Sequence, residues 1–99
     1  MNQVIRRVVI RGRVQGVGYR AWVDHHARRL GLQGWVRNRR DGSVEAVFEG
    51  AEDIVISMVV SCRSGPASAR VDEIAEEEAH ADASGQRRSG EAFSVLPTI

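Results

Sequence analysis

The 99-residue chain contains no lysine, one cysteine and two prolines, and only 5% of its residues are aromatic. A Walker-type phosphate loop ends in Gly-Lys-Ser or Gly-Lys-Thr, so the absence of lysine excludes that nucleotide site. The lone Cys62 excludes an internal disulfide and favours a reducing compartment. No apolar run approaches the roughly 18 residues of a membrane span, and none is long enough for a secretory signal. We therefore expect a cytoplasmic protein with no membrane contact.

The length of the chain and the distribution of its charge indicate how many domains it forms and what kind of ligand it binds. A chain of 99 residues can form a core without disulfides or metal, so we expect a single domain over residues 1–99. Residues 1–50 carry ten arginines and four acids (net +6), whereas residues 51–99 carry four arginines and nine acids (net −5). Proteins that bind many nucleic-acid phosphates usually have a clear positive excess. This balance favours a small anionic ligand over a long polyanion.

The first half of the chain begins with a strand and a helix. Alternating β-branched residues predict a strand over residues 4–11. After a glycine-rich turn, apolar residues at helical spacing predict an amphipathic helix that ends near Gly31. Asp24 and Arg28 are spaced on it as an exposed i, i+4 pair. The predicted apolar stripe of this helix consists of Tyr19, Trp22, Val23, His26 and Leu30.

A hairpin is predicted next. Strand-like segments 34–39 and 43–49 flank Asp41 and Gly42, a strong hairpin signal. A two-residue loop would place Asn38 out of phase with the apolar face of the second strand, because a slip of one residue turns every side chain over. A three-residue loop that ends at a left-handed Gly42 restores the phase.

The second half completes the predicted fold. Residues 52–63 predict a helix, and residues 69–79 predict a strand with a bulge, because their apolar residues fall out of period-two phase. Residues 80–90 predict a mobile loop, and residues 93–96 a last short strand. The order β-α-β-β-α-β predicts an α+β, ferredoxin-like sandwich with two helices on one face of a mainly antiparallel sheet of four to five strands.

The turn before the first helix carries the clearest chemical signal. It reads Gly12-Arg13-Val14-Gln15-Gly16-Val17-Gly18-Tyr19-Arg20. A glycine-rich turn that opens a helix gathers backbone N–H groups at the positive end of the helix dipole, which predicts an anion cradle. Arg20 adds a permanently charged fork that could clamp the same anion. The spacing of the glycines does not fit the dinucleotide fingerprint, and a purely conformational turn is the alternative.

This stretch resembles the first signature of the acylphosphatase family, G-x-V-Q-G-V-x-[FY]-R. Residues 34–44, which read Gly-Trp-Val-Arg-Asn-Arg-Arg-Asp-Gly-Ser-Val, resemble the second, G-x-V-x-N-x-x-D-G-x-V. The resemblance covers residues 5–96 and is weakest over residues 76–90. It implies a ferredoxin-like fold and an enzyme that needs no metal or cofactor. Such an enzyme hydrolyses the carboxyl–phosphate bond of acyl phosphates to a carboxylate and inorganic phosphate.

The resemblance also implies the roles of individual residues. Arg20 matches the phosphate-binding arginine, and Asn38 matches the asparagine that orients the attacking water. The phosphate loop corresponds to the backbone amides of Gln15, Gly16, Val17, Gly18, Tyr19 and Arg20. A carboxylate is a good leaving group, so the reaction needs no nucleophilic side chain, and positioning with charge stabilisation can supply most of the rate.

Two other functions fit parts of the sequence. RNA-binding modules share this sandwich, and Arg7, Arg11, Arg13, Arg37, Arg39 and Arg40 could form a basic side. However, the predicted strand 43–49 lacks the aromatic residues that stack on bases, since its only one, Phe48, points to the core. A non-catalytic module would bind phosphate without hydrolysing it. We expect the enzyme, acting as a monomer on a small acyl phosphate and without nucleic acid.

The remaining reactive side chains predict structural roles. His25 and His26 do not suit a metal, because adjacent helical residues point about 100° apart and no further ligand recurs at a suitable spacing. His26 and Cys62 are predicted to pack in the core. The acidic run 76–78 predicts a solvated strand edge.

Overall fold

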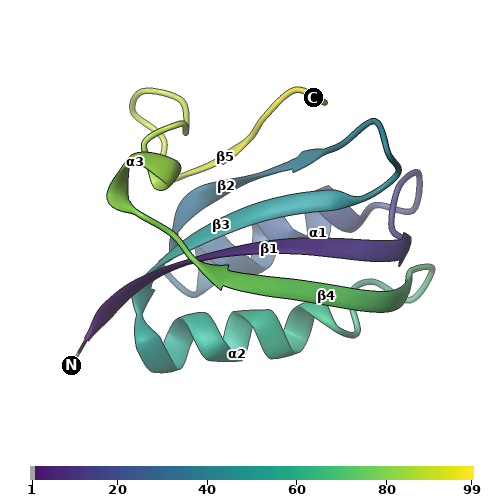
Figure 1. Cartoon of the computed structure of the whole chain (residues 1–99), viewed down its shortest axis with the longest axis horizontal. Helices are drawn as coiled ribbons and strands as arrows, with labels where there is room; N and C mark the ends of the chain where they lie inside the picture. The colour runs from purple at the N-terminus through teal and green to yellow at the C-terminus, as the bar shows by residue number, and fades with distance from the viewer. Residues whose placement is uncertain (1) are drawn as a thin grey trace.

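The computed structural model describes residues 2–99, which form one sheet with helices packed against it (Figure 1). The elements are β1 (Gln3–Arg13), α1 (Tyr19–Arg29), β2 (Gln33–Asn38), β3 (Val44–Ala51), α2 (Glu52–Cys62), β4 (Arg70–Glu78), α3 (Ala81–Ser84) and β5 (Phe93–Val95). The strand order is β4-β1-β3-β2-β5, and only the β2–β5 pair is parallel. This mixed five-stranded sheet confirms the predicted ferredoxin-like βαββαβ fold.

The two long helices, α1 and α2, share one face of the sheet and enclose the core (Figure 1). Alternate residues of the central strands point toward them, since successive strand side chains point to opposite faces. Fully buried examples are Val8, Ile10, Val36, Val44, Ala46 and Phe48. From α2, the predicted apolar stripe of Ile54, Val55, Met58, Val59 and Cys62 packs on the sheet, and all but the partly buried Ile54 are buried.

The apolar stripe of α1 differs from the prediction. The helix buries Tyr19, Val23 and Ala27, which follow one another at intervals of four residues. The predicted Leu30 is 39% exposed, because it caps the helix just before the chain turns at Gly31, whose φ is +72°. His26 is only half-buried, so the prediction of a core histidine is wrong. Its ring lies against Trp22, with the ring centroids 4.2 Å apart.

The β2–β3 hairpin has the predicted phase. Asn38 pairs with Val44, and the Arg39 N–H donates to the Ser43 carbonyl oxygen at 2.8 Å, which leaves a loop of three residues. Gly42 closes the loop with a φ of +93°. Asn38 therefore lies on the face that α1 and α2 cover, together with the apolar residues of β3.

The pairing of β1 with β4 contains a β-bulge, as predicted. Arg11 pairs with Glu73, whereas Gly12 pairs with Val71, so Asp72 is an extra residue on β4. A Cβ atom on Gly12 would lie 2.2 Å from the Arg70 carbonyl oxygen, so glycine is required where the strands approach. β1 thus continues through Gly12 to Arg13, two residues past its predicted end near Arg11.

The region predicted as a mobile loop contains a helical turn, α3, so the prediction is wrong over residues 81–84. The indole N–H of Trp35 donates to the Ala83 carbonyl oxygen at 2.6 Å. The buried Ser84 hydroxyl donates to a Glu49 carboxylate oxygen. These contacts hold α3 on the sheet face opposite α1 and α2. The turn is too short to show helical periodicity in the sequence.

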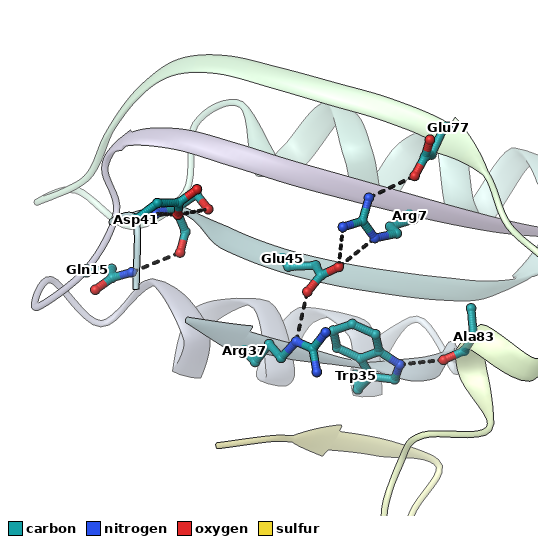
Figure 2. A network of polar contacts seen from close by, with 9 residues as sticks. Arg7, Gln15, Trp35, Arg37, Asp41, Glu45, Glu77 and Ala83 are labelled. Atoms are coloured by element: carbon teal, nitrogen blue, oxygen red, sulfur yellow. Dashed lines mark hydrogen bonds and ion pairs between the residues drawn. The ribbon is translucent and has the colours of Figure 1, made fainter. Parts of the chain in front are cut away.

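A buried ion-pair network crosses the same face of the sheet (Figure 2). The Glu45 carboxylate is almost fully buried and pairs with Arg7 and Arg37, which compensates its loss of water. The Arg37 guanidinium also lies over the Trp35 ring, 4.5 Å from its centroid. Burial lowers the pKa of Arg7, but hydrogen bonds and charge attraction from the carboxylates of Glu45 and Glu77 outweigh this effect. The pKa of Arg7 is therefore raised above its ordinary value. These arginines are therefore engaged inside the protein.

The acidic run lies on an edge strand, as predicted. β4 ends the sheet, and residues 76–78 are exposed along it. These carboxylates also pair with the neighbouring strand. Arg6 lies 3.1 Å from Glu78, and Arg7 lies 2.8 Å from Glu77.

The Tyr19 hydroxyl joins α1 to the end of α2. It donates a 2.6 Å hydrogen bond to the carbonyl oxygen of Cys62, one of the last carbonyls of α2, which have no partner within the helix. Burial raises the pKa of the Tyr19 hydroxyl, so the group remains a donor. Burial likewise raises the pKa of the Cys62 thiol to about 12, and this buried cysteine is unreactive at neutral pH.

We expect Tyr19→Phe to lower the stability of the protein without changing its backbone. The variant keeps the ring but leaves the buried Cys62 carbonyl without its donor, at a cost of about 1–2 kcal/mol. For a domain of this size, that cost corresponds to a decrease in Tm of roughly 5–10 °C. Thermal unfolding followed by circular dichroism measures the decrease. An unchanged Tm would show that water satisfies the carbonyl in the variant.

The hairpin loop should lose stability in acid through Asp41. Hydrogen bonds from the hydroxyl and the backbone N–H of Ser43 lower the pKa of the Asp41 carboxyl from 3.8 to about 2. A lowered pKa stabilises the folded state above the unfolded value, so this stabilisation is complete above about pH 5 and lost as the pH falls toward 2. Urea unfolding of wild type and Asp41→Asn from pH 6 to pH 2 measures it. The difference between the two proteins should be constant down to about pH 5 and then shrink, and a pH-independent difference would contradict the assignment.

Candidate active site

The glycine-rich loop leads from the end of β1 into the first turn of α1. Gly16 and Gly18 have φ values of +73° and +82°, which only glycine adopts readily. A Cβ atom at either position would meet no atom within 4 Å, so the backbone conformation alone requires glycine. Gly18 is the N-cap of α1, no side chain caps this end, and the first turn contains no acid. The first N–H groups of α1 are therefore free of side-chain caps and favour an anion.

The Gln15 side chain fastens this loop to the β2–β3 hairpin (Figure 2). Its amide nitrogen donates to the carbonyl oxygens of Arg39 and Ser43, both at 2.8 Å. Arg39 directly follows Asn38, so the same two bonds set the distance from the loop to Asn38. Sequence reasoning assigned only the backbone amide of Gln15 to the site. The family signature specifies glutamine at this position but does not reveal the role of its side chain, which depends on contact between the loop and a distant hairpin.

A cavity of about 380 Å³ lies between the loop, α1 and the strand ends. It brings together Arg20 and Asn38, which are 18 positions apart in the sequence. All the residues predicted for the site line it except Val17, whose side chain packs against the core. The lining also includes residues that the sequence did not indicate, namely Val14, Ala21, Asp24 and Val95.

The Asn38 side chain contributes a buried acceptor to the cavity. Its Oδ1 atom is buried, and among residues 2–99 no donor reaches it. Leaving a buried acceptor unpaired costs about 1–3 kcal/mol, so such atoms are rare outside sites that receive a ligand or an ordered water. The Asn38 carbonyl oxygen, in contrast, accepts a hydrogen bond from the Ile99 N–H at 3.1 Å, which holds the backbone in place.

Arg20 contributes a cation in the first turn of α1, where the helix dipole disfavours positive charge. In the described part of the chain, its side chain makes no ion pair within 4 Å and no hydrogen bond. The cavity thus combines backbone donors, an arginine and one buried acceptor. This set can bind a small anion and can also orient one molecule that donates a hydrogen bond to Asn38.

Residues 2–99 also bear on the other functions considered from the sequence. They contain no group of three or more His, Cys, Asp or Glu residues placed to hold a metal ion. They also contain no helix that is long and apolar enough to cross a membrane. Of the six arginines considered for RNA, Arg7 and Arg37 pair with Glu45, and Arg11 pairs with Asp41 at 3.3 Å.

The chain is similar to known proteins in both sequence and fold. Residues 6–89 match the family model described as Acylphosphatase. The chain is 62% identical to an acylphosphatase of Bradyrhizobium diazoefficiens, with both sequences covered over their full length. Its structure superposes on an acylphosphatase from Bacillus subtilis with a TM-score of 0.80 and 35% identity, covering 94% of this chain and 98% of the other. For an acylphosphatase from Coxiella burnetii the TM-score is 0.83 with 32% identity, covering 96% and 94%.

A full-length match to curated relatives, the family model and the shared fold all lead to one assignment. The chain belongs to the acylphosphatase family and has acylphosphatase activity (EC 3.6.1.7), the hydrolysis of the carboxyl–phosphate bond of acyl phosphates.

Proposed function

We propose that the loop amides and Arg20 bind the phosphoryl group of the substrate, while Asn38 orients the water that attacks it. The observation that carries this mechanism is the buried, unpartnered Oδ1 of Asn38, a residue that lines the same cavity as Arg20 and the start of α1. A water that donates a hydrogen bond to this oxygen keeps a lone pair free to attack phosphorus.

The binding step uses groups that the fold has already arranged. The backbone amides from Gln15 to Arg20 and the Arg20 guanidinium surround the phosphoryl oxygens, where negative charge is spread in the transition state. Hydrogen-bond donors that are fixed before the substrate arrives need not reorganise during the reaction. They therefore stabilise the charge of the transition state effectively. Gln15 contributes by holding the loop against the hairpin.

The chemical step needs no protein nucleophile. The water oxygen forms a bond to phosphorus, the bond from phosphorus to the acyl oxygen breaks, and the electron pair leaves with the carboxylate. An asparagine amide is not a base at neutral pH, so a phosphoryl oxygen accepts the proton of the water. The products are a carboxylate and inorganic phosphate.

The working state that we propose is a cytoplasmic monomer that acts on small acyl phosphates without nucleic acid. A cavity of about 380 Å³ suits a phosphoryl group with a small acyl group. The single cysteine supports a reducing compartment. Sedimentation of the purified protein tests the monomer, and a larger species would contradict it.

We expect Arg20→Gln to lower kcat/KM for benzoyl phosphate by about 100-fold to 1,000-fold, the usual effect of removing one preorganised charge-stabilising group. Competitive inhibition by inorganic phosphate should weaken as well. The assay contains EDTA, so that no metal contributes. Arg29→Gln is a matched control on the same helix, since Arg29 is exposed and does not line the cavity. Near-normal kinetics in Arg20→Gln would refute the phosphate-binding role.

We expect Asn38→Ala to separate catalysis from binding. The variant removes the acceptor for the water, so kcat should fall by about 100-fold or more, while the inhibition constant of phosphate stays within about twofold of wild type. Urea unfolding checks that the hairpin remains intact. If phosphate inhibition weakened together with kcat, Asn38 would be a phosphate ligand and the proposed role in orienting water would be wrong.

A further inference from the structure

Three of the charged residues of helix α1, Arg20, Asp24 and Arg28, follow one another at intervals of four. Residues four apart lie on the same side of a helix, so Asp24 has an arginine one turn before it and another one turn after it. Arg20 and Asp24 both line the active-site cavity. A carboxylate thus lies one helical turn from the arginine that the proposed mechanism assigns to the phosphoryl group.

The structure shows which arginine Asp24 pairs with. The Arg28 Nε atom donates to Asp24 Oδ1 at 2.9 Å, whereas Arg20 and Asp24 form no ion pair within 4 Å in the described part of the chain. The order of charges favours this choice, because an acid placed N-terminal to its basic partner stabilises a helix more than the reverse order.

Arg28 is also anchored independently of Asp24. Its Nη2 atom donates to the carbonyl oxygen of Phe93 on β5, and the Glu91 carboxylate lies 4.0 Å away. The guanidinium is therefore held at the side of α1 that faces β5. It draws the Asp24 carboxylate toward the C-terminal end of the helix, away from Arg20.

We propose that Arg28 is a positioning residue that keeps Arg20 available for the substrate by holding the Asp24 carboxylate. This inference rests on the proposed role of Arg20 in phosphate binding. Without Arg28, Asp24 is free to pair with Arg20. Its uncompensated charge also repels the anionic substrate. Both effects weaken binding, and neither changes the groups that act on the bound substrate.

The first test is Arg28→Ala, with Arg29→Ala as the control on the same turn of the helix. We expect the KM for benzoyl phosphate and the inhibition constant of inorganic phosphate to rise about three- to tenfold at low ionic strength, with kcat within about twofold. The rise should shrink in 0.5 M salt, since ions screen partly exposed charges. Arg29→Ala should leave all three constants near their wild-type values. If Arg28→Ala changed kcat alone, the inference would be overturned.

The second test removes the negative charge of Asp24 from the Arg28→Ala variant and asks whether phosphate binding recovers. In the double variant Arg28→Ala/Asp24→Asn, KM and the phosphate inhibition constant should return to near wild-type values. A purely structural role of Arg28, through its bond to Phe93, predicts no rescue, and that result would overturn the inference. Arg28→Gln is the second variant should Arg28→Ala unfold. Glutamine keeps a hydrogen-bond donor at this position but carries no charge for Asp24, so the same loss and rescue are expected.

Arg20→Gln, measured in the same assay, separates failure of this inference from failure of the proposed function. If Arg20→Gln weakens phosphate inhibition but Arg28→Ala does not, only the inference about Arg28 is overturned. If Arg20→Gln leaves phosphate inhibition unchanged, Arg20 does not bind phosphate, and both proposals are overturned.

Discussion

Two hydrogen bonds from one side chain set the geometry of the cavity. The Gln15 amide spans from the loop after β1 to the carbonyls of Arg39 and Ser43, the two residues at the base of the hairpin loop. Those carbonyls are already fixed by the pairing of β2 with β3. The loop therefore inherits the rigidity of the sheet, and its amides keep a defined distance from Asn38. Neither the loop nor the hairpin could supply this alignment alone.

Part of the uneven charge along the sequence is neutralised by ion pairs in the folded protein. The basic first half supplies β1, and the acidic second half supplies β4, which is its neighbour in the sheet. Arg6 and Arg7 pair there with the acidic run of β4. Part of the positive charge that suggested an anionic ligand is thus neutralised within the protein. Arg20 differs because its side chain makes no such pair in the described residues.

The parts of the fold that local patterns encode could be predicted from the sequence. The phase of β2 and β3 fixed a loop of three residues, and the broken alternation around Val71 indicated the bulge. Arg20 was indicated by its place after the glycine-rich turn at the helix start, and Asn38 was found through the family signature that covers the hairpin. Their common cavity follows from the predicted topology.

The predictions that were wrong, and the features that were not predicted, depend on contacts between segments that are distant in the sequence. Helix α3 is held by Trp35 and Glu49, which lie far from it in the sequence. Ala27 replaces Leu30 in the buried stripe because α1 ends before Leu30 can reach the core. The bond from Arg28 to β5 likewise requires a strand that comes 65 positions later. Local periodicity contains no information about such contacts.

The groups proposed to bind the phosphoryl group and to orient the water do not change their protonation state near neutral pH. Backbone amides and an asparagine side chain do not ionise, and an arginine keeps its charge throughout the biological range. The Tyr19 hydroxyl, whose pKa burial raises, also stays neutral. The groups proposed to carry the reaction thus keep one protonation state from mildly acidic to mildly alkaline solution. These groups therefore present the same arrangement of charges and hydrogen-bond donors to the substrate across that range.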